Sequence, residues 1–432
     1  MGDLLLTNVR VRGVDGSVDV RVADGRIAEV GPGIVGDVPT IDGGGRPVLP
    51  GLVEPHLHLD KALLGGGDGT LEGAVSATAE AKKGFTHDDV VARAEDVLRR
   101  AVRHGTTLVR TPVDVDPTVG LTSVDALLEV RRRWAGIVEL QVVAFPQEGI
   151  AGRPGTYDLL VEALHRGADV IGGCSYAEDD VEGCREHVRT VFDLAGRFDV
   201  DVDVHADFAT GPDDPRQDLA EYVAELTAER GWGGRTTIGH VTTMAGLPDE
   251  RRRRLVGALA DAGVGLVVLP PTDLYLQGRA APVAELLDAG VATALSSNNV
   301  RNPFTPFGTV DLLDVTLLAA HTQPGGASGA TGGGFGTPEG LDRLLDCATS
   351  GAASMLRVAG ASGATGEGRN SHDLSVGSRA DLVVLDAPGA DHHTALLDLV
   401  PRRYVVSAGT LVAETVTTAT LHGIRTATMM DP

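Results

Sequence analysis

The sequence is poor in cysteine, aromatic residues and lysine, and it has no long hydrophobic run. Its 432 residues include three cysteines, Cys174, Cys184 and Cys347, so we expect no disulfide framework and predict a reducing, cytoplasmic location. No stretch of about 18 apolar residues occurs, which argues against a membrane span. Residues 1–7 lack the basic region and apolar core of a signal peptide.

Positive charge is also scarce. The chain has 37 Lys and Arg against 60 Asp and Glu, a net charge of -23, which excludes nucleic acid and anionic membrane surfaces as expected partners. The partners that we expect are a small-molecule substrate and further copies of the chain in a homo-oligomer. Only three lysines occur, Lys61, Lys82 and Lys83, so the position of each is informative.

The pattern of apolar residues divides the chain into two parts. Residues 4–48 read as short strands, at 4–12, 18–22 and 26–30, before residues 42–45 (Asp-Gly-Gly-Gly) break the chain. After residue 373 the residue pattern again predicts strands, at 380–385, 403–408 and 411–414. We therefore predict a small β-sandwich built from residues 1–48 and 373–432.

Between these parts, apolar strands alternate with amphipathic helices, which is typical of a (β/α)8 TIM barrel, here spanning 49–372. The glycine-rich segment 323–334 is expected to be a surface linker or a lid. The expected strands are 52–59, 107–113, 137–145, 169–172, 201–204, 236–240, 264–269 and 291–297, and the expected helices are 88–103, 123–134, 157–166, 180–196, 216–229, 249–262, 282–289, 309–320 and 338–357.

Polar residues that suit a metal site lie at the ends of the predicted strands. His56 and His58 are two residues apart, so on a strand both point to the same side. His205 and His240 end the fifth and sixth strands, and Asn298 ends the eighth. Catalytic groups of such barrels lie at these strand ends, and neutral imidazoles suit Zn²⁺ or Fe²⁺. Each histidine alone is also compatible with a plain core position.

Several segments together resemble a known family: 53–61, 110–115, 140–149, 203–205 and 276–279. They are similar to the amidohydrolase superfamily, in the branch of cytosine deaminase and N-isopropylammelide isopropylaminohydrolase. The resemblance covers nearly the whole chain and agrees with a split β-sandwich around a barrel.

The resemblance also implies roles for individual residues. One divalent metal, zinc or iron, would be held by His56, His58 and His205. His240 would polarise the substrate or the hydrolytic water, and Gln147 would hydrogen-bond the amide-like edge of a heterocycle. Lys61 matches the isopropylaminohydrolase side of the branch.

The sequence departs from the family at three positions. Asn298 replaces the aspartate that ligates the metal and shuttles a proton; an amide oxygen can bind a metal but cannot take that proton. Phe208 stands where cytosine deaminases have a glutamate, and Asp207 where the isopropylaminohydrolases have a histidine. Loss of a general base typically costs about 10²–10⁴-fold in rate. We expect Asp207, Lys61 or His240 to carry the proton instead.

Other readings of these residues stay open. Asp207 would equally orient a metal-bound histidine, Lys61 would also fit a solvated charge at a strand end, and Asn298 is compatible with a weak or absent metal. Tyr275 and Arg301 are candidates to bind an acidic or planar part of the substrate, with structural roles equally open.

The predicted function is that of a metal-dependent hydrolase. It would act on a C–N bond of a small nitrogen heterocycle or cyclic amide, by deamination or by amide or ring opening. Phe208 and Asn298 disfavour cytosine deamination itself. The alternatives are a non-hydrolytic enzyme on the same scaffold (a lyase, isomerase or cyclase) and a non-catalytic binding protein.

Overall fold

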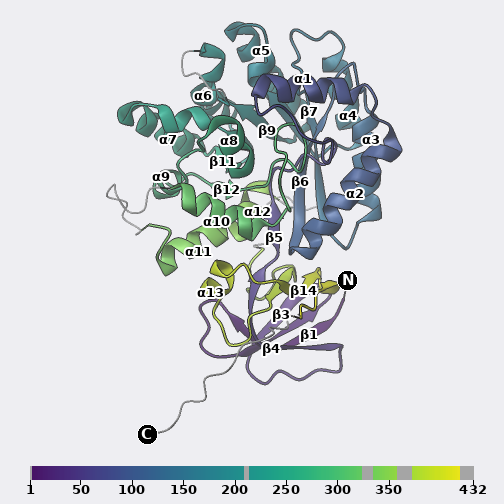
Figure 1. Ribbon diagram of the computed structural model, residues 1–432, viewed down its shortest axis with the longest axis vertical. Coiled ribbons are helices and arrows are strands. Elements are labelled where there is room, and N and C mark those ends of the chain that lie inside the picture. The colour runs from purple at the N-terminus through teal and green to yellow at the C-terminus, as the bar shows by residue number, and fades with distance from the viewer. Residues whose placement is uncertain (1, 209–213, 324–333, 358–371, 419–432) are drawn as a thin grey trace, which may run out of the picture.

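The computed structural model describes residues 2–208, 214–323, 334–357 and 372–418. They form a barrel surrounded by helices, with a smaller sheet domain at one end (Figure 1). The chain starts in the sheet domain, passes through the barrel and returns to the sheet domain. Nearly all of the glycine-rich segment, residues 324–333, lies outside the described residues, and so does the predicted part of the β-sandwich beyond residue 418.

The barrel confirms the predicted fold. Eight parallel strands follow one another in sequence order around it, with helices between successive strands. The strands are β5 (Leu52–Glu54), β6 (Thr106–Asp114), β7 (Glu139–Phe145), β8 (Val170–Cys174), β9 (Asp201–Ala206), β10 (Thr236–His240), β11 (Gly265–Val268) and β12 (Thr293–Leu295).

The helices account for the wide spacing of these strands along the sequence. In the barrel they are α1 (Leu71–Lys82), α2 (His87–Arg103), α3 (Thr122–Arg133), α4 (Thr156–Arg166), α5 (Val181–Phe198), α6 (Ala220–Arg230), α7 (Asp249–Ala262), α8 (Pro270–Gln277), α9 (Val283–Asp288), α10 (Leu312–Thr322), α11 (Pro338–Asp346) and α12 (Ser350–Leu356). Short 3-10 turns lie at Ser175–Ala177, Pro215–Gln217 and Thr242–Gly246.

Burial explains why these segments form a barrel. Strand β6 is buried at every position, as expected for a parallel strand covered on both sides. Helix α2 buries one stripe, which includes Val90, Ala94, Val97, Leu98 and Ala101, while most of its charged residues face water. Buried strands covered by amphipathic helices recur around the barrel. Polar residues that are buried at the strand ends are therefore exceptions to the apolar core and candidates for a function.

The first and last strands meet at the mouth of the barrel, which places the two ends of the predicted site side by side. Leu57 forms a parallel bridge with Asn298, and the backbone N–H of His58 donates to the Asn298 carbonyl over 2.9 Å. Glu54, at the end of β5, accepts hydrogen bonds from both Ser296 and Ser297. This closure brings Asn298 next to the histidine pair.

The second body is a mixed seven-stranded sheet that both ends of the chain supply. Its order is β15-β14-β13-β4-β1-β2-β3, and β13 pairs antiparallel with β4, so the late strands complete the early ones as predicted. Its elements are β1 (Leu4–Val11), β2 (Val18–Ala23), β3 (Arg26–Gly31), β4 (Thr40–Pro50), β13 (Leu382–Leu385), α13 (His392–Leu397), β14 (Arg402–Ser407) and β15 (Thr410–Glu414). The exact domain boundaries stay a prediction.

The glycine run at 42–45 was wrongly expected to break the chain. It lies inside β4, which pairs in parallel with β1 through a shift of register. A Cβ at Gly43 would lie 2.3 Å from a methyl carbon of Val9, so the close approach of the two strands requires glycine there. Gly44 and Gly45 have positive φ, which lets the strand continue through a bulge.

Other expectations were wrong at element boundaries. Strand β5 ends at Glu54, so the histidine pair lies in the loop just after it. The single helix expected over 338–357 is two helices, α11 and α12, and three helices, α1, α8 and α13, were not predicted. Among the described residues, none of the helices has the length and apolar character that a membrane crossing requires.

Candidate metal centre and active site

A narrow, buried pocket opens at the barrel mouth. Most of the residues singled out from the sequence meet there. It is lined by His58, Lys61, Gln147, Tyr176, His205, Phe208, His240, Thr272, Asn298, Asn299 and Phe304. The carboxyl ends of the strands are where such barrels place their chemistry, so this pocket is the candidate active site.

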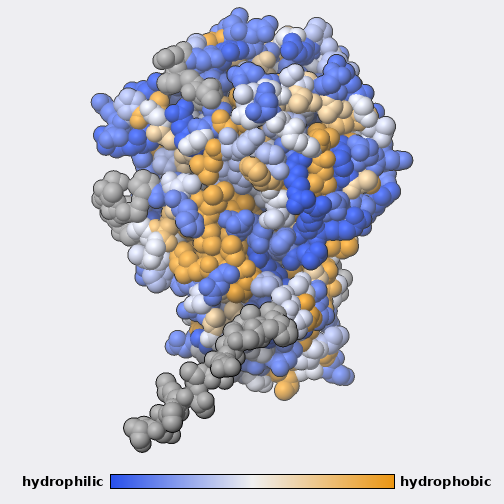
Figure 2. Space-filling model, viewed as in Figure 1, coloured by the Kyte–Doolittle hydropathy of each residue, from blue (hydrophilic) through white to orange (hydrophobic). Residues whose placement is uncertain are grey.

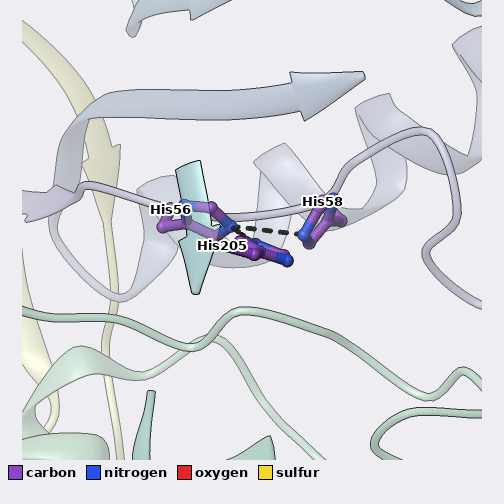
Figure 3. Close-up of side chains that lie close together, drawn as sticks. All are labelled: His56, His58 and His205. Atoms are coloured by element: carbon purple, nitrogen blue, oxygen red, sulfur yellow. Dashed lines mark hydrogen bonds between the residues drawn. The ribbon is translucent and has the colours of Figure 1, made fainter. Parts of the chain in front are cut away.

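Three histidine side chains converge (Figure 3), and two of them, His58 and His205, line the pocket. The Nε2 atom of His56 lies 2.6 Å from Nε2 of His205 and 3.3 Å from Nε2 of His58. All three side chains are buried. Three ring nitrogens that face one another form the kind of donor set that holds a divalent metal through three protein ligands.

The groups behind the histidines set their protonation. Nδ1 of His56 lies 3.1 Å from Oδ1 of Asp203, an arrangement that favours the tautomer in which Nδ1–H donates to that carboxylate and the Nε2 lone pair faces the cluster. Arg110 lies 3.4 Å from the other oxygen of Asp203 and holds it in place. Burial lowers the pKa of both His58 and His205 well below the usual range, so neutral rings with free lone pairs are favoured.

Asn298 supplies a fourth candidate ligand. It is buried, it lines the same pocket, and its Oδ1 has no hydrogen-bond partner within the described structure. Its φ of 59° lies in the left-handed region, which asparagine tolerates better than most residues. A buried oxygen without a partner is costly, and a cation held by the three histidines would offset that cost. The residues present therefore fit a single divalent metal.

His240 lies against the ring of His205 in the histidine cluster and is paired with a carboxylate of its own. Its Nδ1 is 2.6 Å from Oδ1 of Asp273, in the first turn of α8, which leaves Nε2 for the pocket. Burial lowers the pKa of His240, and Asp273 opposes this effect. The ring of Phe208 covers the His240 ring at a centroid distance of 3.9 Å. Strand β10 therefore ends in an oriented imidazole that is shielded from water.

Lys61 reaches the pocket as part of a buried charge network. Its Nζ lies 2.6 Å from Asp114 and 3.0 Å from Oε1 of Gln147. Lys82, in α1, binds the second oxygen of Asp114 and also Asp116. The alternative of a solvated strand-end charge for Lys61 does not fit, because the side chain is only 1% exposed.

Three sequence candidates are not among the described residues that line this pocket. The carboxylate of Asp207 accepts the N–H groups of Leu219 and Ala220 at the start of α6, so its geometry does not favour the predicted role in proton transfer. Tyr275 lines a neighbouring apolar groove with Leu274, Phe307, Val315 and Leu318, and hydrophobic side chains gather on the face where α8 and α10 lie (Figure 2). Tyr275 also packs against the cluster that contains Phe208 and Phe304. Arg301 is exposed and does not line the pocket.

Comparison with known proteins gives the family. The sequence profile described as "Amidohydrolase family" matches residues 39–413. This chain belongs to the amidohydrolase family.

Individual amidohydrolases are similar over nearly their whole length. The chain is 28% identical to the N-isopropylammelide isopropyl amidohydrolase of Pseudomonas sp. (strain ADP), over 95% of this chain and 97% of that one. The crystal structure of a 5-methylcytosine deaminase from Klebsiella pneumoniae superposes with a TM-score of 0.86, at 27% identity, and covers 97% of this chain and 99% of that one. That of the N-isopropylammelide isopropylaminohydrolase from Burkholderia multivorans has a TM-score of 0.81 at 30% identity, covering 96% and 99%.

Sequence reasoning missed the carboxylates that orient the histidines of this amidohydrolase. Asp203 lies two residues before His205 on β9, so a period of two along that strand was a usable signal. Asp273 had no such signal, because α8 was not predicted and 33 residues separate Asp273 from His240. Asp114, the partner of Lys61, lies within the segment 110–115 that carries the family resemblance, but the resemblance assigned it no role.

Proposed function

We propose that this amidohydrolase uses one divalent metal to hydrolyse a C–N bond of a small nitrogen heterocycle or cyclic amide. The observation that carries the proposal is the convergence of His56, His58 and His205 beside the unpartnered oxygen of Asn298 in a buried pocket. Relatives named as deaminases and aminohydrolases of heterocycles support the reaction class.

The three histidines would hold the metal through their Nε2 atoms, with the amide oxygen of Asn298 beside them. Zinc and iron both suit imidazole ligands, so both are candidates. When bound, the ion would supply Lewis-acid activation of water and of the substrate. Asp203 would keep His56 in the tautomer that presents a lone pair, and Arg110 would keep Asp203 charged and oriented.

His240 is the residue that we assign to proton movement, in place of the family's aspartate. Its Nε2 would take the proton of the attacking water and pass it to the departing nitrogen, while Asp273 stabilises the charged ring. Asp207 is not given this role, since both oxygens of its carboxylate are bonded to backbone N–H groups of α6.

The walls of the pocket would select a planar ring. Phe208 and Phe304 offer flat apolar faces. Lys61 fixes the side-chain amide of Gln147 through its Oε1, so that Gln147 presents one orientation to a ring edge. Because the charge of Lys61 is compensated by Asp114, the pocket favours an uncharged or weakly charged heterocycle. The cytoplasmic location and a homo-oligomeric state remain predictions.

Metal content and turnover test this function together. The protein loaded with zinc or with iron would be offered cytosine, 5-methylcytosine, N-isopropylammelide, pterin and simple lactams, and release of ammonia or amine and ring opening would be measured. We expect turnover of at least one compound, lost on chelation and in His205→Ala. His321→Gln, which alters an exposed histidine of α10, is the matched control and should keep the activity. Fully metal-loaded protein that turns over none of these compounds would count against the proposal.

A further inference from the structure

A second group of possible metal ligands lies where the barrel meets the sheet domain. None of its residues lines the pocket at the barrel mouth. Asp342 belongs to α11 of the barrel, and His392 and His393 begin α13 of the sheet domain. The two helices are in contact. Nε2 of His392 and Nε2 of His393 each lie 2.9 Å from the same oxygen, Oδ1 of Asp342.

The convergence of the two histidines is not a consequence of helix geometry. Adjacent residues on a helix point about 100° apart and do not face one another. Here both side chains turn to one carboxylate oxygen, and their rings lie 4.0 Å apart. The side chains are 15% and 19% exposed, so the pair is largely packed yet still reachable from water. Two imidazole nitrogens and a carboxylate oxygen lie close enough together to act as three protein ligands of one metal ion.

One competing cation lies close to the group, the guanidinium of Arg12. Arg12 lies 3.5 Å from Oδ1 of Asp342 but holds Asp346 more closely, at 2.7 Å. The guanidinium can therefore stay on Asp346 when another cation takes Asp342.

We propose that Asp342, His392 and His393 form a second transition-metal site, which ties α11 of the barrel to α13 of the sheet domain. Two imidazoles and a carboxylate suit Zn²⁺, Ni²⁺ or Cu²⁺ rather than Mg²⁺ or Ca²⁺. Three protein ligands leave a position for water. The site shares no residue with the histidine cluster of the barrel, and its role is structural, because no part of the candidate active-site pocket touches it.

Counting bound metal in the full chain tests this proposal. The protein would be stripped with a chelator and titrated with Zn²⁺, with bound metal measured after removal of excess. We expect two equivalents for the parent and one for His393→Gln, with His321→Gln as the control that keeps two. The isosteric variant Asp342→Asn, which also loses one equivalent, guards against a folding defect. A double variant of the barrel cluster, His56→Ala with His58→Ala, should keep the junction equivalent, so failure of the two sites is distinguishable.

Two further measurements distinguish a true metal site from an accidental proximity of the two histidines. Arg12→Gln removes a competing positive charge and should tighten the junction equivalent. Zn²⁺ added after the barrel site is filled should raise the melting temperature of the parent but not that of His393→Gln. Equal metal content in the parent, His393→Gln and Asp342→Asn would overturn the proposal, and so would a melting temperature that the second equivalent leaves unchanged.

Discussion

Replacing Asp273 with asparagine tests whether His240 moves the proton. Both side chains are buried, and their nearest atoms are 2.6 Å apart, so a protonated His240 would form an ion pair with Asp273 shielded from water. For charge centres about 4 Å apart and an effective dielectric constant of about 20, the attraction is about 4 kcal/mol. That corresponds to about 10³-fold in rate, which lies inside the range for general acid–base catalysis. We therefore expect Asp273→Asn to lower kcat about 10³-fold.

The assay is the pH dependence of kcat and kcat/KM on whichever heterocycle the enzyme turns over. Burial lowers the pKa of His240 and Asp273 raises it, so removing the carboxylate should move the acid limb of the profile to lower pH. KM and metal content should stay near the parent values. Asp203→Asn is the matched control: it faces His56, so it should weaken metal affinity about 10–100-fold instead. A fully metallated Asp273→Asn whose kcat stays within about tenfold of the parent would refute the role of His240.

Three other substitutions give distinct outcomes. Asn298→Asp adds a negative oxygen beside the histidine cluster, so the variant should keep more metal than the parent after dialysis against a chelator; equal loss of metal from the parent and the variant would contradict the placement of Asn298. Burial raises the pKa of Asp207 to about 6, above the unfolded value of about 3.9, so stability should fall as pH rises from about 4 to 6. Asp207→Asn should remove that dependence in urea unfolding and leave kcat nearly unchanged, whereas a large loss of kcat would restore its catalytic role. Lys82→Met leaves the carboxylates of Asp114, Asp116 and Glu148 without the cation that they share. It should lower the free energy of unfolding by about 3–5 kcal/mol. The exposed control Lys83→Met should lower it by less than about 1 kcal/mol. Similar losses for the two lysines would show that the network contributes little.

The barrel could be predicted from the sequence because its strands are buried on both faces and its helices on one. Strand β6 and helix α2 carry these patterns clearly over many residues. The glycine run in β4 could not be read this way, since close contact between two strands, not local propensity, keeps it extended. Helix α8 begins with Pro270 and Pro271; two consecutive prolines favour a turn in the sequence, although proline is well tolerated in the first turn of a helix.

Part of the site could be predicted because some of its residues are close in sequence or end strands that the sequence reveals. His56 and His58 are close in sequence, and the positions of His205 and His240 follow once the strands are assigned. The direction of a side chain after a strand ends is set by local backbone angles, and Asp207 has a φ of 53°, which turns it towards α6. Contacts such as that of His240 with Asp273 depend on how a loop folds back, which periodicity does not reveal.

An anomalous-difference map from crystals grown with zinc or iron tests the central claim most directly. At the barrel mouth, the predicted result is one strong peak in contact with the Nε2 atoms of His56, His58 and His205 and within reach of the Asn298 oxygen; a peak at the junction site of Asp342, His392 and His393 would be separate from it. A map without a peak at these histidines, from crystals of protein shown to carry metal, would contradict the claim that this cluster is the metal centre of the enzyme.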